Sequence, residues 1–73
     1  MNDIESILIE FVTEHFAVDD VRLGMDLRED LELSEGDIFE IASFAEDNWE
    51  IDIPGSFRWD TLGDLVEFIE ENI

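Results

Sequence analysis

The side chains that could do chemistry in this chain are few, and nearly all of them are carboxylates. The sequence has 22 aspartates and glutamates, one histidine and no cysteine, which excludes a thiol nucleophile and thiolate metal ligands. Paired carboxylates act as general acid and base only in a pocket that separates their pKa values, and 73 residues leave little room for one. Ser34 and His15 fall on different predicted helices, so they do not suggest a catalytic triad. The chain is therefore not expected to be an enzyme.

A dense group of acidic residues precedes and begins the second predicted helix. Its members are Glu29, Asp30, Glu32, Glu35 and Asp37. Carboxylate oxygens are the ligands that Ca²⁺ and Mg²⁺ prefer, but this spacing does not supply the glycine and the closing glutamate of an EF-hand loop. Weak cation binding is compatible with the group, whereas a dedicated metal site is not expected.

The segment from Asp30 to Pro54 resembles the second helix of acyl carrier proteins and the residues that flank it. The similar features, in order along the chain, are Asp30-Leu31, an acidic helix that ends near Trp49, Ile53-Pro54, and the closing run Thr61 to Val66. Counted back from Pro54, the family's Asp-Ser-Leu attachment triplet falls on Ser34-Glu35-Gly36. The resemblance implies a degenerate carrier protein, because Glu35 has no hydroxyl to accept phosphopantetheine and Gly36 replaces the apolar residue that follows the serine.

Ser34 is the hydroxyl next to the attachment position, and it also has a structural role to fill. With Asp37 three residues later it forms a capping-box pattern, in which the serine oxygen accepts a backbone N–H bond worth about 1 kcal/mol. In the family the residue before the attachment serine is an aspartate with the same capping part. Capping is therefore the preferred role of Ser34, and no cofactor is expected. A functional acyl or peptidyl carrier with phosphopantetheine on Ser34 is an alternative.

Charge is the other property that the composition fixes. Three arginines and no lysine leave a formal net charge of -19, while the hydrophobic fraction of 45% argues against a disordered acidic tail. Such a charge repels nucleic acid and anionic membranes, so neither is expected as a direct partner. Any partner that recognises the chain by charge should present a basic surface.

The resemblance implies that the acidic second helix docks on the basic patch of a carrier-recognising enzyme. The candidate partner-binding residues on this helix are Glu35, Asp37, Glu40, Glu46 and Asp47. An alternative of a different class is an acidic DNA mimic, which would occupy the basic groove of a nucleic-acid-binding protein.

Hydrophobic periodicity predicts the elements that position these residues. Apolar residues recur every three or four positions in three segments, which predicts helices over about residues 3–16, 34–49 and 62–72. Capping-box patterns precede them at Asn2, Ser34 and Thr61. Residues 17–33 show no such period and are predicted to form a long loop anchored by Leu27 and Leu31, and residues 56–60 at most a short turn of helix.

These elements predict one all-α domain over residues 1–73, a small antiparallel three- to four-helix bundle of the acyl carrier protein type. The longest apolar run is too short to span a membrane and the N-terminus does not resemble a signal peptide, so a cytoplasmic protein is expected. Phe39 and Phe44 fall off the apolar stripe of the second helix, and at least one should be partly exposed. The predicted core is Ile4, Ile7, Leu8, Phe11, Leu31, Ile38, Ile41, Ala45, Trp49, Ile53, Leu62, Leu65, Val66 and Ile69.

Overall fold

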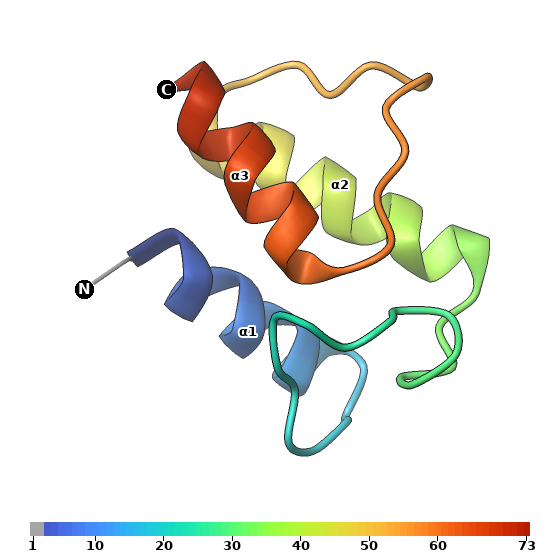
Figure 1. The fold of residues 1–73 in the computed structure, drawn as a ribbon. Helices are drawn as coiled ribbons and strands as arrows, with labels where there is room; N and C mark the ends of the chain where they lie inside the picture. The colour runs from blue at the N-terminus through green and yellow to red at the C-terminus, as the bar shows by residue number, and fades with distance from the viewer. Residues whose placement is uncertain (1–2) are drawn as a thin grey trace.

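The structure, a computed structural model, describes residues 3–73 as three α-helices without a strand between them. The helices are α1 (Asp3–His15), α2 (Glu35–Trp49) and α3 (Leu62–Asn72), as Figure 1 shows. The predicted all-α class and the three helix positions are confirmed. The cap predicted at Asn2 lies outside the described residues. No helix within residues 3–73 is both long and apolar enough to cross a membrane.

Complete capping boxes set the starts of α2 and α3. The Ser34 Oγ accepts the backbone N–H of Asp37 at 3.1 Å, and the Asp37 carboxylate accepts the N–H of Ser34 at 3.1 Å. Thr61 and Asp64 make the same reciprocal pair at 3.1 and 3.3 Å. Each box satisfies two backbone donors that a helix start otherwise leaves free, so both predicted boxes are confirmed.

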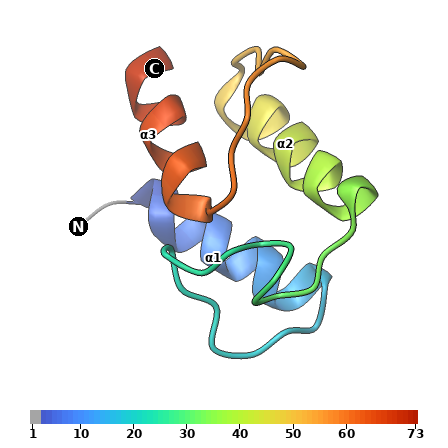
Figure 2. The same ribbon diagram turned by 45° about the vertical axis from the view of Figure 1, so that its right-hand side comes forward.

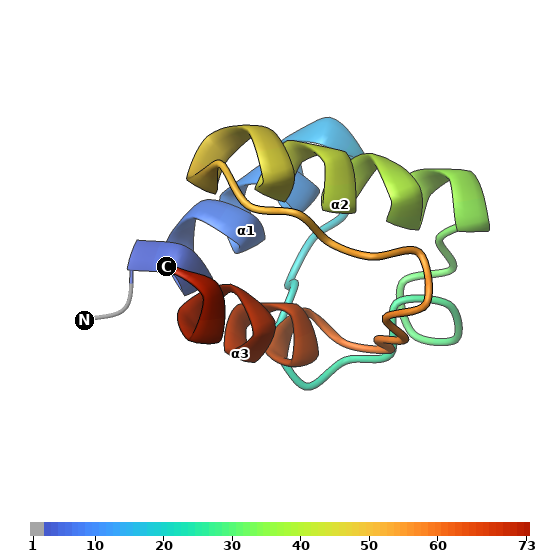
Figure 3. The same cartoon turned by 90° about the horizontal axis from the view of Figure 1, so that it is seen from above.

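The helix α1 runs in the opposite general direction to both α2 and α3, as Figures 1 and 3 show together. It packs against both of them (Figure 2). The helices α2 and α3 can run the same way because residues 51–61 lead the chain back across the molecule between them. This connection contains a turn at Gly55 and Ser56 and no helix, so the described chain has three helices and not four.

The hydrophobic core takes its side chains from the connections as well as from the helices. The buried residues are Ile4, Leu8, Val12, Val21, Leu27, Leu31, Leu33, Ile38, Ile41, Ala45, Trp59, Leu62, Leu65, Val66 and Ile69. The loop anchors Leu27 and Leu31 are confirmed. The prediction was wrong to place Ile7, Phe11, Trp49 and Ile53 in the core, because all four are only half-buried. Phe11, Trp49 and Ile53 pack against the periphery of this core.

The first connection (residues 16–34) and the second connection (residues 51–61) are hydrogen-bonded to each other where they meet, near the start of α3. The N–H of Leu27 donates to the carbonyl of Asp60 at 2.9 Å, and the N–H of Gly63 donates to the carbonyl of Leu23 at 3.0 Å. Within the first connection, the N–H of Leu33 donates to the carbonyl of Leu27 at 2.9 Å. These bonds satisfy backbone groups that would otherwise be buried without a partner, and they hold the loop in a fixed shape.

Candidate functional site

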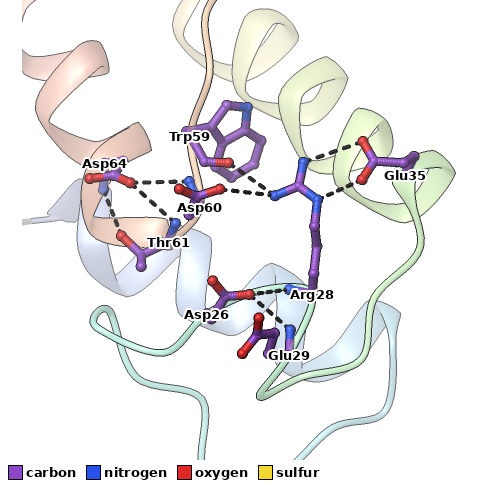
Figure 4. A network of polar contacts seen from close by, with 8 residues as sticks. All are labelled: Asp26, Arg28, Glu29, Glu35, Trp59, Asp60, Thr61 and Asp64. Carbon is purple, nitrogen blue, oxygen red and sulfur yellow. Dashed lines mark hydrogen bonds and ion pairs between the residues drawn. The ribbon is translucent and has the colours of Figure 1, made fainter.

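Glu35 is the first residue of α2, and its carboxylate is held by a single arginine. The Arg28 Nε donates to one Glu35 oxygen at 2.5 Å, and the Arg28 Nη2 donates to the other at 3.3 Å. This is the two-bond geometry in which a planar guanidinium matches a carboxylate. Figure 4 shows the two side chains pointing at each other across the start of the helix. The position that the resemblance assigns to phosphopantetheine therefore has an ion pair within the domain.

Arg28 joins three segments of the chain. Besides Glu35, its Nη1 donates to the Asp60 carboxylate at 3.2 Å and to the Trp59 carbonyl at 3.5 Å. Arg28 belongs to the first connection, Glu35 to α2, and Trp59 and Asp60 to the second connection. We call these four residues the Arg28 clamp. Because its members come from separate segments, the clamp fixes the start of α2 relative to both connections (Figure 4).

A tight turn built on Asp26 positions Arg28. One oxygen of Asp26 accepts the backbone N–H groups of Arg28 and Glu29, at 2.9 and 2.8 Å. The N–H of Asp26 in turn donates to the Asp30 carboxylate at 2.8 Å. An aspartate that bonds the backbone two residues later is a common way to make a turn. Asp26 therefore sets the direction from which the guanidinium reaches Glu35.

The clamp keeps Glu35 ionised. The hydrogen bond from Arg28 is the largest effect and lowers the pKa of Glu35. Desolvation, the next largest, opposes this shift, and the positive charges of Arg28 and Arg58 lower the pKa further. The same hydrogen bond is the main cause of the raised pKa of Arg28. The group at this position is thus an anion with a fixed counterion, and it is poorly suited to take part in proton transfer near neutral pH.

A groove of about 410 Å³ extends from the clamp along α2 and the second connection. Its apolar lining includes Ile38, Phe39, Ala42, Ile53 and Phe57. Phe39 is 71% exposed, which confirms that an aromatic residue of this helix lies off the core. Arg58 also lines the groove and has no hydrogen bond or ion pair within residues 3–73. The groove therefore combines an exposed aromatic ring with charges of both signs.

The structure gives four of the five candidate partner-binding carboxylates a contact inside the domain. Glu35 bonds Arg28, and Asp37 bonds the backbone of the α2 cap. Glu40 lies 2.7 Å from the His15 Nε2, and the Glu46 carboxylate accepts the N–H of Ile53 at 2.8 Å. Within residues 3–73, Asp47 has no such contact.

The five carboxylates are not gathered into one patch. Glu35 and Glu46 line the groove next to the second connection, whereas Glu40 faces α1 through its contact with His15. Most of the five remain open to solvent: the side chains of Glu35 and Glu40 are 78% and 52% exposed. Ser34 is exposed and acts as the α2 cap, so its capping role is confirmed.

Arg28 and Asp60 are the site residues that sequence reasoning missed. A signal was present, because a chain with 22 acidic residues has only three arginines and no lysine. One of these scarce cations lies seven residues before Glu35, in a loop that must fold back on the helix start. The bond to Asp60, 32 positions further along the chain, had no signal in the sequence.

No family model, curated protein or solved structure matches this chain. The resemblance to acyl carrier proteins thus remains a prediction from the sequence. Within residues 3–73, no group of three potential metal-ligating side chains converges on one point. Among the acidic residues near the start of α2, Asp26, Asp30 and Asp37 instead accept backbone N–H groups, and Glu35 bonds Arg28.

Proposed function

We propose that this chain is an acyl-carrier-protein-like interaction module that presents the acidic surface of α2 to a basic partner and has no phosphopantetheine. The observation that carries the proposal is the Arg28 clamp at the first residue of α2. A carrier needs a free hydroxyl at this position, whereas Glu35 supplies a carboxylate bonded to Arg28, which in turn bonds Asp60 of the second connection. Residue 35 therefore stabilises the fold, and the function that we propose for the domain is recognition of a partner by its surface.

The arrangement of elements supports a carrier-type bundle. The capped α2 follows a long loop whose apolar residues are buried, and α1 packs against both other helices. A loop of this length without regular structure is unusual in so small a domain and is often functional. In the carrier fold such a loop precedes the helix that docks on partner enzymes, so a carrier-recognising enzyme is the proposed class of partner.

The residues around Ser34 do not fit the phosphopantetheine arm. The Ser34 Oγ already accepts the N–H of Asp37, and esterification would weaken it as an acceptor. The phosphodiester would also add an anion beside Glu35 and Asp37, both of which are acidic residues in the first turn. This like-charge repulsion opposes the benefit that a helix N-terminus offers to an anion.

Intact-mass spectrometry tests the missing arm. The purified chain is incubated with coenzyme A and a broad-specificity phosphopantetheinyl transferase, and only the unmodified mass is expected. The arm adds about 340 Da as a covalent modification. A gain of that mass that disappears in Ser34→Ala would contradict the proposal and indicate ordinary acyl carriage.

Association kinetics test the docking surface. With a carrier-recognising enzyme as the partner, Glu40→Lys and Asp47→Lys should slow association and flatten its dependence on salt, because fewer charges steer the encounter. The matched control is Glu67→Lys with Glu71→Lys on α3, which makes the same change in net charge away from α2. Equal effects of the two pairs would show that only the net charge matters. If the chain instead competes with duplex DNA for a nucleic-acid-binding protein, the DNA-mimic alternative holds.

A further inference from the structure

The groove beside Glu35 differs from the rest of the molecule in its charge. Its lining contains two arginines, Arg28 and Arg58, and two glutamates, Glu35 and Glu46, so its formal charge is zero. The whole chain has a formal net charge of -19 and only three arginines. The positive charges of both lining arginines act on Glu35. A strongly acidic chain thus places two of its three cations at one groove, where they offset the carboxylates.

Two other hollows on the described part of the chain keep a net negative charge. One is lined by Glu10 and Glu14 of α1 without an arginine. The other sets Arg58 against three carboxylates, those of Asp64, Glu67 and Glu71. An apolar group that entered either hollow would take water away from carboxylates whose charge is not offset, which is unfavourable. Burial of an apolar group is therefore least costly in the neutral groove.

Polar contacts hold the second connection against α2 at two places along this groove. The Glu46 carboxylate accepts the N–H of Ile53 at 2.8 Å. The Arg28 clamp joins Glu35 to Asp60. Between these contacts the connection runs back along α2 toward the start of that helix, as Figures 1 and 3 show. The walls of the groove are thus fixed before a partner arrives, which lowers the entropic cost of binding.

Phe39 is the apolar residue of the groove that the core leaves uncovered. Its neighbour Ile38 is buried, and Ala42, Ile53 and Phe57 are half-buried, whereas Phe39 is largely exposed. Within residues 3–73, no other aromatic ring packs on the Phe39 ring. An exposed aromatic side chain at an apolar hollow is typical of a residue that contributes strongly to an interface. The ring is therefore open to a group that enters from outside.

We infer that this groove receives one apolar side chain of leucine size from the partner protein, packed on Phe39 and flanked on the partner by basic residues. The inference rests on the proposed function, which supplies the basic partner. Charge complementarity places the basic residues at the flanks, because the net charge of -19 lies entirely outside the groove lining. A lysine inside the groove would lose hydration without meeting a net charge. A second copy of this chain is repelled by its own charge.

Peptide titrations followed by NMR test the inference on the unmodified chain. The probe is Ac-AKAAKLAKAAK-NH₂, and two control peptides carry glutamine or lysine in place of the leucine. We expect saturable shifts of the Phe39 ring resonances and about tenfold tighter binding of the leucine peptide than of either control. Recognition by charge alone would make the peptide with the additional lysine bind tightest, and that order would overturn the inference. Shifts of Phe39 that depend on protein concentration without peptide would assign the groove to a second copy and would also overturn it.

Two exposed apolar residues supply a matched pair of variants. Phe39→Ala should remove most of the preference for leucine over glutamine and leave the affinity for the glutamine peptide nearly unchanged. The control is Ile73→Ala, at a position that is 67% exposed and outside the groove lining, and it should keep the full preference. Neither substitution opens a cavity in the core, and an unchanged backbone NMR spectrum checks the fold. A leucine preference that survives Phe39→Ala would overturn the inference.

The inference and the proposed function fail by different outcomes. Equal binding of the leucine and glutamine peptides would overturn the apolar contact and leave the basic partner standing. A further peptide, in which glutamine replaces every lysine around the leucine, keeps the apolar side chain without the charge. If this peptide binds as tightly as the probe, the basic partner of the proposed function is refuted. A leucine preference that still depends on Phe39 would in that case support the groove.

Discussion

Replacing Leu27 with alanine should destabilise the domain as much as replacing a core residue of a helix. Leu27 lies in a connection without regular structure, yet its side chain is fully buried. Removing a fully buried leucine side chain costs about 2–5 kcal/mol when the cavity cannot collapse. Backbone bonds from Leu27 to Asp60 and from Leu33 to Leu27 restrain the loop from moving in to fill the cavity. We therefore expect a cost in the upper half of that range.

Such a loss would be a large share of the total stability. A domain of 73 residues is expected to have a free energy of unfolding of about 4–11 kcal/mol. Urea unfolding followed by the fluorescence of the two tryptophans, of which Trp59 is only 7% exposed, measures the change. Ile41→Ala in α2 is the buried helical control and should cost a similar amount, and Leu23→Ala, at a half-buried loop position, should cost less. A cost for Leu27→Ala no larger than that for Leu23→Ala would refute the packed loop.

Three further predictions concern the polar contacts and the charge. Arg28→Gln should free Glu35 and raise its pKa toward the ordinary value, which an NMR titration measures. The same substitution should speed amide exchange at Leu27, and an unchanged exchange rate there would contradict the clamp. The pKa of Glu35 is lowered in the folded chain, so the ionised carboxylate contributes fully to stability above its ordinary pKa near 4.5. This contribution is lost as the pH falls through the lower pKa of the folded state. In Arg28→Gln, acid unfolding should therefore lack the loss of stability that comes from protonation of Glu35. Ser34→Ala should cost about 1 kcal/mol in urea unfolding and Ser34→Asp much less, since aspartate also caps helices. Added salt should raise the melting temperature by screening the charge of -19, and a melting temperature that is insensitive to salt would argue against appreciable self-repulsion.

The helices could be predicted from the sequence because their signals are local. Apolar spacing and the boxes at Ser34 and Thr61 act over three or four residues, and both boxes form as expected. The core was harder to predict where long-range packing decides burial. Trp59 has no periodic neighbours, and its burial depends on the return of the second connection between α2 and α3. Phe11 and Trp49 match the apolar spacing but are only half-buried, because they pack against the periphery of the core and against other rings.

The candidate site shows the same limit. The place of Glu35 at the start of α2 follows from its position next to a capping serine. Its bond to Arg28 depends on the turn at Asp26, and the bond from Arg28 to Asp60 depends on how two distant loops meet. Neither contact has a characteristic spacing. The sequence therefore identified the unusual residue, and the structure supplied the role that this residue has.

The hydrogen bonds between the two connections also imply that these segments open and close together. Residues 17–33 cannot detach from the start of α3 without breaking the bonds of Leu27 to Asp60 and of Gly63 to Leu23. Local opening is therefore expected as one cooperative unit, with similar amide protection on both sides of the contact. A partner that orders the groove along residues 53–59 would in turn slow exchange in the first connection. Because this coupling is reciprocal, a substitution that loosens the first connection enough to populate its open form should also weaken that partner's binding.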